Sequence, residues 1–320
     1  MQHTAQKINS AIKQAKHILI VSHKNPDGDT LSSACALMQY LRTIEIAHTA
    51  FCATPINPLM RFLPHIEYFV TDHALFNRMQ FDTIVVLDSG DLAYAGVAHL
   101  IAALPYEPTI INIDHHFTNT HYGHHNLVIP DAASTTEVLY RFFKANQITL
   151  DMHIATCLMT GLITDTDHFS NPATSASALQ TGADLLRSGA NLNLIRGWTL
   201  RNHSIKSLKL WGRVFSRLTK NQKHEIAYTV ITTEDQKEFG ITDKDIEGIA
   251  NFLNKIGEAK IALLLKEQEN GTIKGSFRTT ADDTDVAALA KSLGGGGHKK
   301  AAGFTISGSL KETASGWRIV

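Results

Sequence analysis

Short apolar runs rich in β-branched residues recur through the first part of the chain, and helix-like segments separate them. Such runs predict strands that are buried on both faces, as in a parallel sheet with helices packed on either side. The expected strands are His17–Ser22, Ile46–Ala53, Thr83–Leu87 and Thr109–Ile113. The expected helices are Thr4–Lys16, Leu31–Arg42, Ser134–Asn146, Met152–Ile163 and Ser175–Ser188. We therefore expect an α/β domain that binds its ligands at the carboxyl ends of its strands.

The pattern changes after residue 190. Residues from Asn191 to about Leu218 are polar, basic and helix-like, which predicts a helical connector. A smaller α+β domain is expected beyond it, with strand Glu225–Thr232, a helix from Asp243 to Ile256, a hairpin of Lys260–Glu269 and Thr272–Thr279, helix Val286–Leu293 and strand Gly303–Ser307. Asn270-Gly271 predicts a type I′ hairpin turn, which needs positive φ at both positions. The expected division is thus 1–190, 191–218 and 219–320, since 320 residues suit two domains.

Charge is balanced over the whole chain but not along it. Thirty Lys and Arg residues equal thirty Asp and Glu residues, so no overall basic field is present to hold long nucleic acid. Residues 1–203 carry 12 basic and 16 acidic side chains, whereas residues 204–320 carry 18 and 14. This asymmetry favours metal ions in the first part and an anionic ligand held by the second.

The three cysteines, Cys35, Cys52 and Cys157, lie in apolar stretches without a CxxC spacing. This pattern favours reduced, buried thiols in a cytosolic protein. The N-terminus has an amphipathic helix pattern without the apolar core of a signal peptide. No run approaches the ~20 apolar residues that a membrane span needs. We expect a cytoplasmic protein without membrane contact.

Acidic and histidine residues cluster where four predicted elements end. Pro26 and Gly28 predict a turn after the first strand, with three of these side chains on one rim. The four clusters are His23 to Asp29, with His23, Asp27 and Asp29 as candidates; Asp88, with Asp91 nearby; Asp114-His115-His116; and Asp165-Thr166-Asp167.

Four carboxylates at one sheet edge repel one another, so the arrangement is unfavourable without cations. Two divalent ions would balance Asp27, Asp29, Asp88 and Asp165. Carboxylates mixed with imidazoles, without thiolates, favour manganese, iron or zinc over magnesium alone. Two ions ~3.5–4 Å apart are the usual device for displacement at phosphorus. Taken singly, an Asp after a buried strand is more often a helix N-cap or a solvated strand end than a ligand, and His121, His124 and His125 fit surface positions.

Four consecutive glycines precede His298 near the C-terminus. Backbone N–H groups of glycine can approach an anion closely, and an arginine fork such as that of Arg278 suits phosphate. A flexible turn is the structural alternative. Lys299 and Lys300 are either further phosphate contacts or solvated surface lysines.

The segments HKNPDGDT, VVLDSGD, INIDHH and LITDTDHF resemble, in this order, the four motifs of the DHH phosphoesterase family. The segment GSFRTT…DVAALAKSLGGGGHKKAAGF resembles the DHH-associated C-terminal domain of the same family. Together the two resemblances span nearly the whole chain. They are strongest to the stand-alone subgroup of oligoribonucleases (nanoRNases) and dinucleotide phosphodiesterases. By this resemblance residues 1–190 would be the catalytic domain and residues 219–320 the substrate-binding domain.

The resemblance also implies roles for individual residues. His23 and Asp27 would hold one manganese ion, Asp29, His115 and Asp165 a second, and Asp88 would bridge the two. Two further residues would be catalytic: Asp114 would orient the histidine pair, and His116 would face the scissile phosphate. Asn25 would be loop scaffold or a phosphate contact. Substrate binding would fall to Arg278, Gly295, Gly296, Gly297 and His298.

Three positions depart from the family pattern or are open. Asp285 adds negative charge to the substrate-binding domain, where relatives often have Asn. His168 would touch substrate or cap its loop. Phe169 would stack on a base or belong to the core.

The expected function is manganese-dependent hydrolysis of phosphodiesters in short oligoribonucleotides or in linear or cyclic dinucleotides. Adenosine 3′,5′-bisphosphate phosphatase and cyclic-di-AMP phosphodiesterase are the alternatives as main activity. A catalytically inert nucleotide-binding module is the alternative from another class. Long duplex nucleic acid is excluded as a partner, and the resemblance implies a homodimer.

Overall fold

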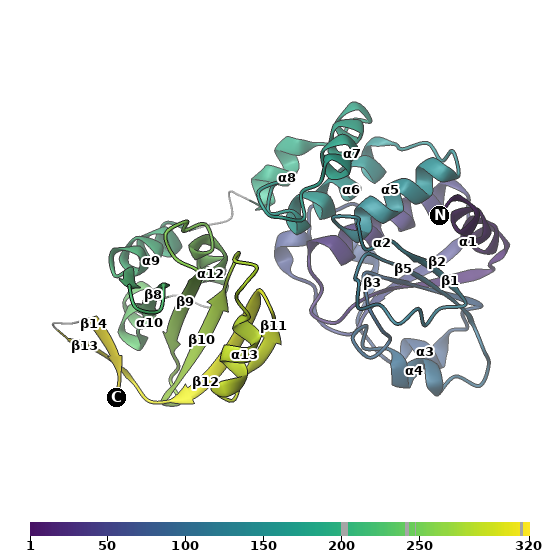
Figure 1. The fold of residues 1–320 in the computed structure, drawn as a ribbon. Helices are drawn as coiled ribbons and strands as arrows, with labels where there is room; N and C mark the ends of the chain where they lie inside the picture. The colour runs from purple at the N-terminus through teal and green to yellow at the C-terminus, as the bar shows by residue number, and fades with distance from the viewer. Residues whose placement is uncertain (200–203, 241–242, 247, 314–315) are drawn as a thin grey trace. The chain divides into compact units, whose positions relative to one another are not determined.

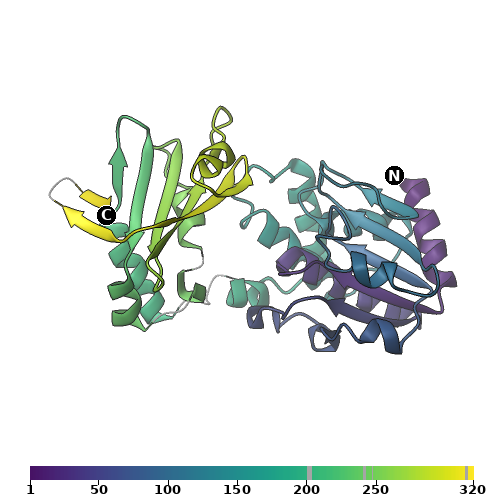
Figure 2. The ribbon, with the colours of Figure 1, turned by 90° about the horizontal axis from the view of Figure 1, so that it is seen from below.

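The computed structural model describes residues 1–199, 204–240, 243–246, 248–313 and 316–320. The chain divides into two compact units, Met1–Asn202 and His203–Val320 (Figures 1 and 2). This boundary falls inside the segment predicted as the connector. Helix α8 (Leu192–Thr199) packs on the first unit, and helix α9 (Ile205–Ser216) packs on the second.

The first unit is built on a six-stranded parallel sheet of order β3-β2-β1-β4-β5-β6. Its strands are β1 (His17–Ser22), β2 (Ala47–Cys52), β3 (Phe69–Val70), β4 (Thr83–Leu87), β5 (Thr109–Asp114) and β6 (His125–Val128). The buried parallel strands confirm the predicted α/β architecture.

Helices cover both faces of this sheet (Figure 1). They are α1 (Gln2–Gln14), α2 (Gly28–Thr43), α3 (Leu75–Arg78), α4 (Ala98–Ala102), α5 (Thr135–Ala145), α6 (Met152–Asp165) and α7 (Ala176–Arg187), with 3-10 turns η1 (Pro58–Met60) and η2 (Ile66–Tyr68). Ile18 and Ile20 belong to the core under α1, α2, α5 and α6, whereas Leu19 and Val21 face the core under α3 and α4. Alternate residues of one strand therefore supply the two cores.

The first unit differs from the prediction in its first turn and in several short elements, α3 and α4 among them. The turn expected over His23 to Asp29 ends at Asp27, because the Asp27 side chain caps α2 and the helix begins at Gly28. Strands β3 and β6 were not predicted, since β3 has two residues and β6 has a single buried one, Leu127. The cysteines Cys35, Cys52 and Cys157 are buried, as expected.

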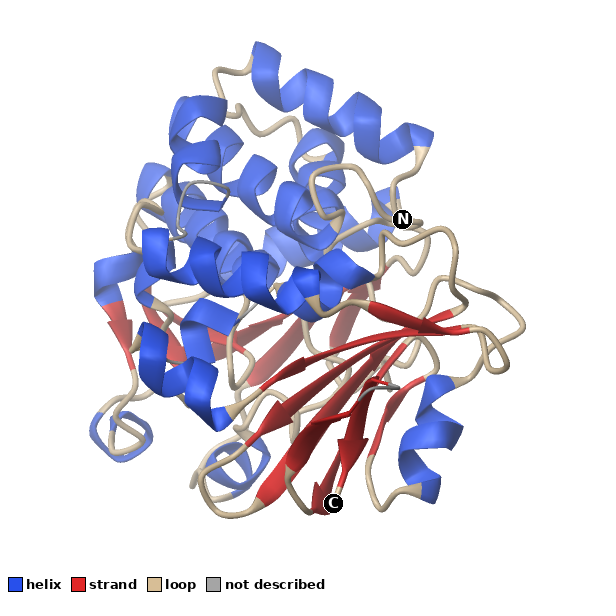
Figure 3. Cartoon of the chain, turned by 90° about the vertical axis from the view of Figure 1, so that its left-hand side faces the viewer, coloured by secondary structure: helices blue, strands red, loops and turns tan. Residues whose placement is uncertain are grey.

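The second unit contains a six-stranded mixed sheet of order β11-β12-β10-β9-β8-β7 (Figure 3). Only β8 and β9 run parallel among its described pairs. Its elements are β7 (Thr219–Asn221), β8 (Ile226–Ile231), α10 (Thr233–Phe239), α11 (Asp243–Ile246), α12 (Ile249–Leu253), β9 (Ile261–Glu267), β10 (Thr272–Arg278), α13 (Val286–Ser292), β11 (Gly296–His298), β12 (Ala301–Ser307), β13 (Leu310–Thr313) and β14 (Gly316–Ile319). Helices α9 and α12 cover one face, and α13 covers the other.

The helix expected from Asp243 to Ile256 is wrong as a continuous element. Gly248 has φ +91° between α11 and α12, and a left-handed residue cannot continue a right-handed helix. The type I′ turn is also wrong. Gly271 has φ +73°, but Asn270 does not have positive φ, and the loop between β9 and β10 spans residues 268–271.

The C-terminal hairpin β13–β14 and the strand β11 were not predicted either. Part of the glycine run pairs with β12, where a Cβ atom on Gly297 would lie 2.6 Å from the Cα atom of Ala302. Gly295 is equally restricted, because its Cβ would lie 2.1 Å from the Gly303 carbonyl oxygen. Close backbone packing thus accounts for glycine at both positions.

Within the described residues, none of the helices combines the length and the apolar character that a bilayer crossing requires.

Candidate active site

Asp88 lies at the centre of the acidic and histidine cluster, directly after β4. Its Oδ2 atom is 3.6 Å from His23 Nε2, and its Oδ1 atom is 3.7 Å from both His115 Nε2 and His116 Nδ1. The side chain is buried, and Thr135 Oγ1 donates to Oδ1 at 2.8 Å. Asp88 also has φ +59°, a left-handed conformation that is strained for a residue other than glycine and recurs at functional sites.

The loop after β1 brings His23 and Asp27 to Asp88. Asp27 Oδ1 accepts the amides of Asp29 and Thr30, both at 3.0 Å, and lies 3.8 Å from His23 Nε2. His23 Nδ1 is 2.9 Å from the Lys24 carbonyl, to which it donates. The carbonyl therefore fixes the imidazole so that Nε2 faces the carboxylates.

Asp29 is held by the N-terminus of α5. Its Oδ2 accepts the Thr135 amide at 2.6 Å, and its Oδ1 accepts the Thr136 amide at 3.0 Å. The first N–H groups of a helix have no partner within the helix, so a buried carboxylate satisfies them. Ser134 begins this helix by accepting the amide of Glu137.

Asp114 is fully buried at the end of β5, and it fixes His116. Its Oδ1 accepts His116 Nδ1 at 2.7 Å and the His115 amide at 2.8 Å, while its Oδ2 accepts Asn119 Nδ2 at 2.6 Å. His116 is 42% exposed, with Nε2 left for a ligand.

The ring of His115 is held by a different partner. Its Nδ1 lies 3.2 Å from the Ala132 carbonyl, and its Nε2 lies 3.4 Å from Asp165 Oδ2. Asp114 thus binds the ring of one histidine of the pair, whereas a main-chain carbonyl orients the other. Asp165 ends α6, and Asn171 Nδ2 donates to its carbonyl at 2.8 Å.

Two glycines allow the close approach of helices α2, α5 and α6 at this site. A Cβ atom on Gly161 of α6 would lie 2.5 Å from Asp29 Oδ1 and 2.4 Å from Thr136 Cγ2. A Cβ atom on Gly28 would lie 2.5 Å from Thr164 Oγ1. These distances leave no room for a side chain at either position.

The charges of the cluster shift the pKa values of its members. Burial and the charges of Asp88 and Asp165 hold the pKa of Asp29 well above its usual range. Burial, followed by Asp88 and Asp27, does the same to the pKa of Asp165. These shifts show that the carboxylates repel one another.

The pKa values of two imidazoles, those of His23 and His116, shift in the direction that favours the charged form. Burial alone would lower the pKa of His23, but the carboxylates of Asp27 and Asp88 outweigh it and raise the pKa to about 11. The hydrogen bond to Asp114 raises the pKa of His116 to about 9. The cluster therefore attracts positive charge.

Three overlapping groups in the described part of the chain could hold a metal ion. In each group, ligand atoms lie within 4.8 Å of one another. The groups are His23, Asp27 and Asp88; Asp29, His115 and Asp165; and Asp88, His115 and His116. The repulsion among the carboxylates and the mixture of carboxylate and imidazole donors both fit divalent cations.

Sequence reasoning missed several residues at this site. Thr135, Thr136, Gly161 and Asn119 come from segments without an acidic motif. The Ser134-Thr135-Thr136-Glu137 pattern before an apolar run marks a helix start and was the available signal. Gly161 gives no such signal, because its role depends on a contact with a distant helix.

Several residues whose roles the sequence left undecided have structural contacts. Asp285 caps α13 by accepting the amides of Ala287 and Ala288. Phe169 packs on the core of the first unit. Lys300 Nζ lies 2.8 Å from Asp282 Oδ1 and 2.6 Å from the Ala281 carbonyl. His168 belongs to a left-handed turn, Asp167 to Phe169, after α6.

Within the second unit, the backbone brings Arg278 and His298 to the same end of the sheet. Both residues pair with Ala301 of β12, Arg278 from β10 and His298 from β11. Arg278 Nε donates to Asn251 Oδ1 at 2.9 Å. Beside Arg278 is a cavity of about 460 Å³, whose polar lining includes Asn251, Lys266, Lys274 and Ser276. Gly295, Gly296 and Gly297 lie next to this end of the sheet, at the start of β11.

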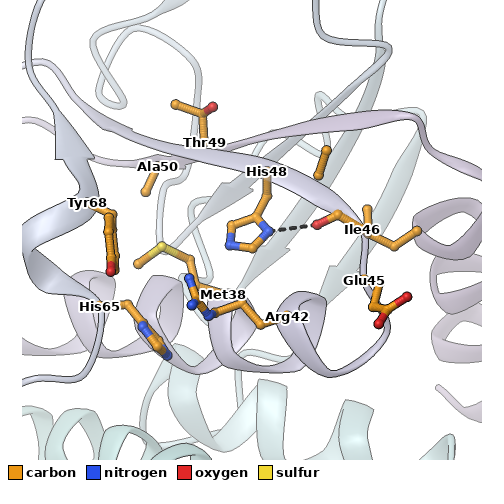
Figure 4. A pocket seen from close by; sticks show the side chains of 10 residues that line it. Met38, Arg42, Glu45, Ile46, His48, Thr49, Ala50, His65 and Tyr68 are labelled. Atoms are coloured by element: carbon orange, nitrogen blue, oxygen red, sulfur yellow. Dashed lines mark hydrogen bonds between the residues drawn. The ribbon is translucent and has the colours of Figure 1, made fainter.

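A second cavity, of about 540 Å³, lies in the first unit away from Asp88 (Figure 4). Its lining comes from the C-terminal part of α2, from β2 and from η2, and it includes Arg42, His48, His65 and Tyr68. Asp29 occupies the other end of α2. This cavity therefore contains none of the predicted site residues.

The fold and the cluster define a two-unit α/β protein whose first unit has a carboxylate and imidazole site at the strand ends. Residues 17–162 match the DHH family, N-terminal domain, and residues 223–315 match the DHHA1 domain. The chain belongs to the DHH family and carries the DHHA1 domain.

Curated relatives cover most of the chain. The bifunctional oligoribonuclease and PAP phosphatase NrnA of Thermus thermophilus is 27% identical over 91% of this chain and 84% of its own length. The protein of the same name from Mycoplasma genitalium is 25% identical, over 93% and 91%. A crystal structure of an exopolyphosphatase-related protein from Bacteroides fragilis has a TM-score of 0.86 at 24% identity, and the match covers 95% of this chain and 91% of that one. This last likeness supports the fold.

Proposed function

We propose that this protein is a manganese-dependent phosphodiesterase that hydrolyses short oligoribonucleotides or linear or cyclic dinucleotides to mononucleotides. The observation that carries the proposal is the convergence of His23, His115 and His116 on Asp88, at 3.6 to 3.7 Å. The names of the relatives, oligoribonuclease and PAP phosphatase, support the substrate class.

We assign the metal ligands as His23, Asp27, Asp29, Asp88, His115 and Asp165. When bound, two divalent ions would supply a water of lowered pKa and neutralise charge on the phosphate. Asp88 belongs to two of the three ligand groups, and its two oxygens face different partners: Oδ2 faces His23, and Oδ1 faces His115. This position suits a ligand shared by two ions.

His116 is proposed to act on the leaving group. Hydrolysis forms a bond between the water oxygen and phosphorus and breaks the bond to the leaving oxygen, which needs a proton. Asp114 accepts from Nδ1 of His116 and raises its pKa to about 9 in the metal-free protein, which favours the protonated ring. Nε2 can then donate to a phosphate oxygen or protonate the leaving oxygen.

The second unit is proposed to bind the anionic part of the substrate. Arg278, Gly295, Gly296, Gly297 and His298 remain the proposed contacts. A cavity beside Arg278 that includes Lys266 and Lys274 supports an anionic ligand for this unit.

Replacing Asp88 tests the proposal. The purified protein with Mn²⁺ should release mononucleotides from pApA or from RNAs of two to five nucleotides. Asp88→Asn should lower kcat/KM by at least about 10²-fold, because it removes a charge shared by three imidazoles. Asp131→Asn, an exposed acid of the same unit, is the matched control. Absence of any phosphodiester hydrolysis by the wild type with Mn²⁺ would refute the proposal.

Two alternatives are tested in the same assay. If adenosine 3′,5′-bisphosphate proves to be the best substrate, the 3′-phosphatase activity is the main one. The bifunctional names of the relatives favour this activity as a second one. A nucleotide-binding module without activity would bind its ligand equally well after Asp88→Asn. Cyclic-di-AMP belongs in the same panel.

A further inference from the structure

Two aromatic side chains lie exposed to solvent on the loops that surround Asp88. Phe117 follows His116 directly and is 86% exposed, and Tyr94 lies six residues after Asp88 and is 47% exposed. A large aromatic ring in water forgoes the burial that stabilises most aromatic residues. Two such rings next to a polar cluster therefore need an explanation other than core packing.

Tyr94 is in direct contact with the cluster. Its ring centroid lies 5.0 Å from that of His23, with 37° between the two planes. The Tyr94 amide donates to Asp91 Oδ1 at 2.7 Å, which fixes the turn that carries the ring. One side of the ring thus packs against His23, while about half of the residue stays open to solvent.

The loops that carry Tyr94 and Phe117 are fastened to each other. The Thr120 amide donates to the Gly90 carbonyl at 2.9 Å. Asn119 Nδ2 and Tyr122 Oη both donate to the Ser89 carbonyl, each at 3.1 Å. Since Asn119 also donates to Asp114, the loops that carry the two rings are held in place relative to the cluster.

We propose that Tyr94 and Phe117 form a nucleobase-binding site beside the Asp88 cluster. The proposal rests on the proposed function and specifies where that substrate places a base. A nucleotide carries a flat aromatic base one sugar away from its phosphate, so a phosphate at the cluster brings a base near these loops. Aromatic side chains are the usual stacking partners of unpaired bases, and stacking accepts every base. The site therefore suits short single-stranded substrates of mixed sequence.

Fluorescence tests this site without requiring turnover. The probe is a hydrolysis-resistant, phosphorothioate-linked dinucleotide that contains 2-aminopurine, titrated with Mn²⁺ present. Stacking should quench its fluorescence on the wild-type protein. Tyr94→Ala and Phe117→Ala should each reduce the quenching and weaken binding by roughly 5- to 150-fold. Tyr94→Phe should retain both, because it keeps the ring.

The control variant is Tyr68→Ala, which removes a ring of similar exposure, 54%, on η2. It should bind like the wild type. A dinucleotide with one abasic sugar should bind equally to the wild type and to both alanine variants. The inference would be overturned if the wild type and the alanine variants quenched the probe equally, or if the wild type did not quench it. It would also be overturned if the alanine variants lost as much affinity for the abasic ligand as for the probe. Quenching without hydrolysis of any substrate would instead count against the proposed function alone.

Discussion

Asp114 and Ala132 hold the two imidazoles of the histidine pair through different chemical groups, a carboxylate and a main-chain carbonyl. The carboxylate of Asp114 accepts from His116, whereas the neutral carbonyl of Ala132 faces His115 Nδ1. A carboxylate partner stabilises the imidazolium form of the ring that it accepts from. His116 is therefore the ring of the pair that suits proton donation.

Replacing Asp114 by Asn should lower the pKa of His116 from about 9 toward 6.5, the ordinary value of a histidine side chain. The raised pKa keeps the ring charged as pH rises to about 9 in the wild type, while the variant should lose the proton at a lower pH. NMR titration of the imidazole protons in metal-free protein measures this. The rate at pH 8 should fall by at least about 10²-fold, the usual contribution of a general acid.

Asp131→Asn serves as the control in that titration, because Asp131 is an exposed acid of the same unit. An unchanged pKa of His116 in Asp114→Asn would contradict the assignment of Asp114 as its main partner.

At the scale of elements, the site depends on how closely α2, α5 and α6 approach one another. Asp29 of α2 binds the N-terminus of α5, and Gly161 of α6 leaves the space for both. Gly161→Ala should lower the free energy of unfolding by about 1–3 kcal/mol, because the added methyl group overlaps Asp29 and Thr136. Denaturant unfolding measures this, and Mn²⁺ affinity should fall with it.

Gly197→Ala is the matched control for this variant. Gly197 lies inside α8, and a Cβ atom there would meet nothing within 4 Å. In a helix interior the alanine should stabilise the protein by about 0.5–1 kcal/mol. Equal effects of the two substitutions would show that the close approach at Gly161 has no energetic consequence.

The sequence could predict the strand ends of the site but not the contacts between distant helices. Apolar runs followed directly by His23, Asp88 and Asp114 identify both the strands and the residues at their carboxyl ends. The hydrogen bonds from α5 to Asp29 join residues 106 and 107 positions apart, and no local pattern encodes them. The helix expected in the second unit likewise included Gly248, where the structure has a left-handed residue between α11 and α12.

At the scale of the whole molecule, the two units carry opposite net charge, and each unit gathers its charged side chains at a different kind of site. The first concentrates four carboxylates around Asp88, which raises the pKa values of Asp29 and Asp165. The second has Lys266, Lys274 and Arg278 around one cavity. The charge asymmetry of the sequence is consistent with this contrast. The glycine run is a different case, because part of it forms strand β11, where close backbone packing also requires glycine.

Adding Mn²⁺ to metal-free protein should release protons. His23 has a pKa of about 11 without metal, so at pH 7 it carries a proton that a ligand must lose. Asp29 and Asp165, whose pKa values are raised, add a further fraction. We expect about one proton or more per protein at pH 7, and Mn²⁺ affinity should rise with pH. Calorimetric titration in buffers of different ionisation enthalpy measures the number of protons released. Asp88→Asn should reduce the release, and His224→Gln, an exposed histidine of the second unit, should leave it unchanged. Equal release by Asp88→Asn and wild type would show that the ions bind elsewhere.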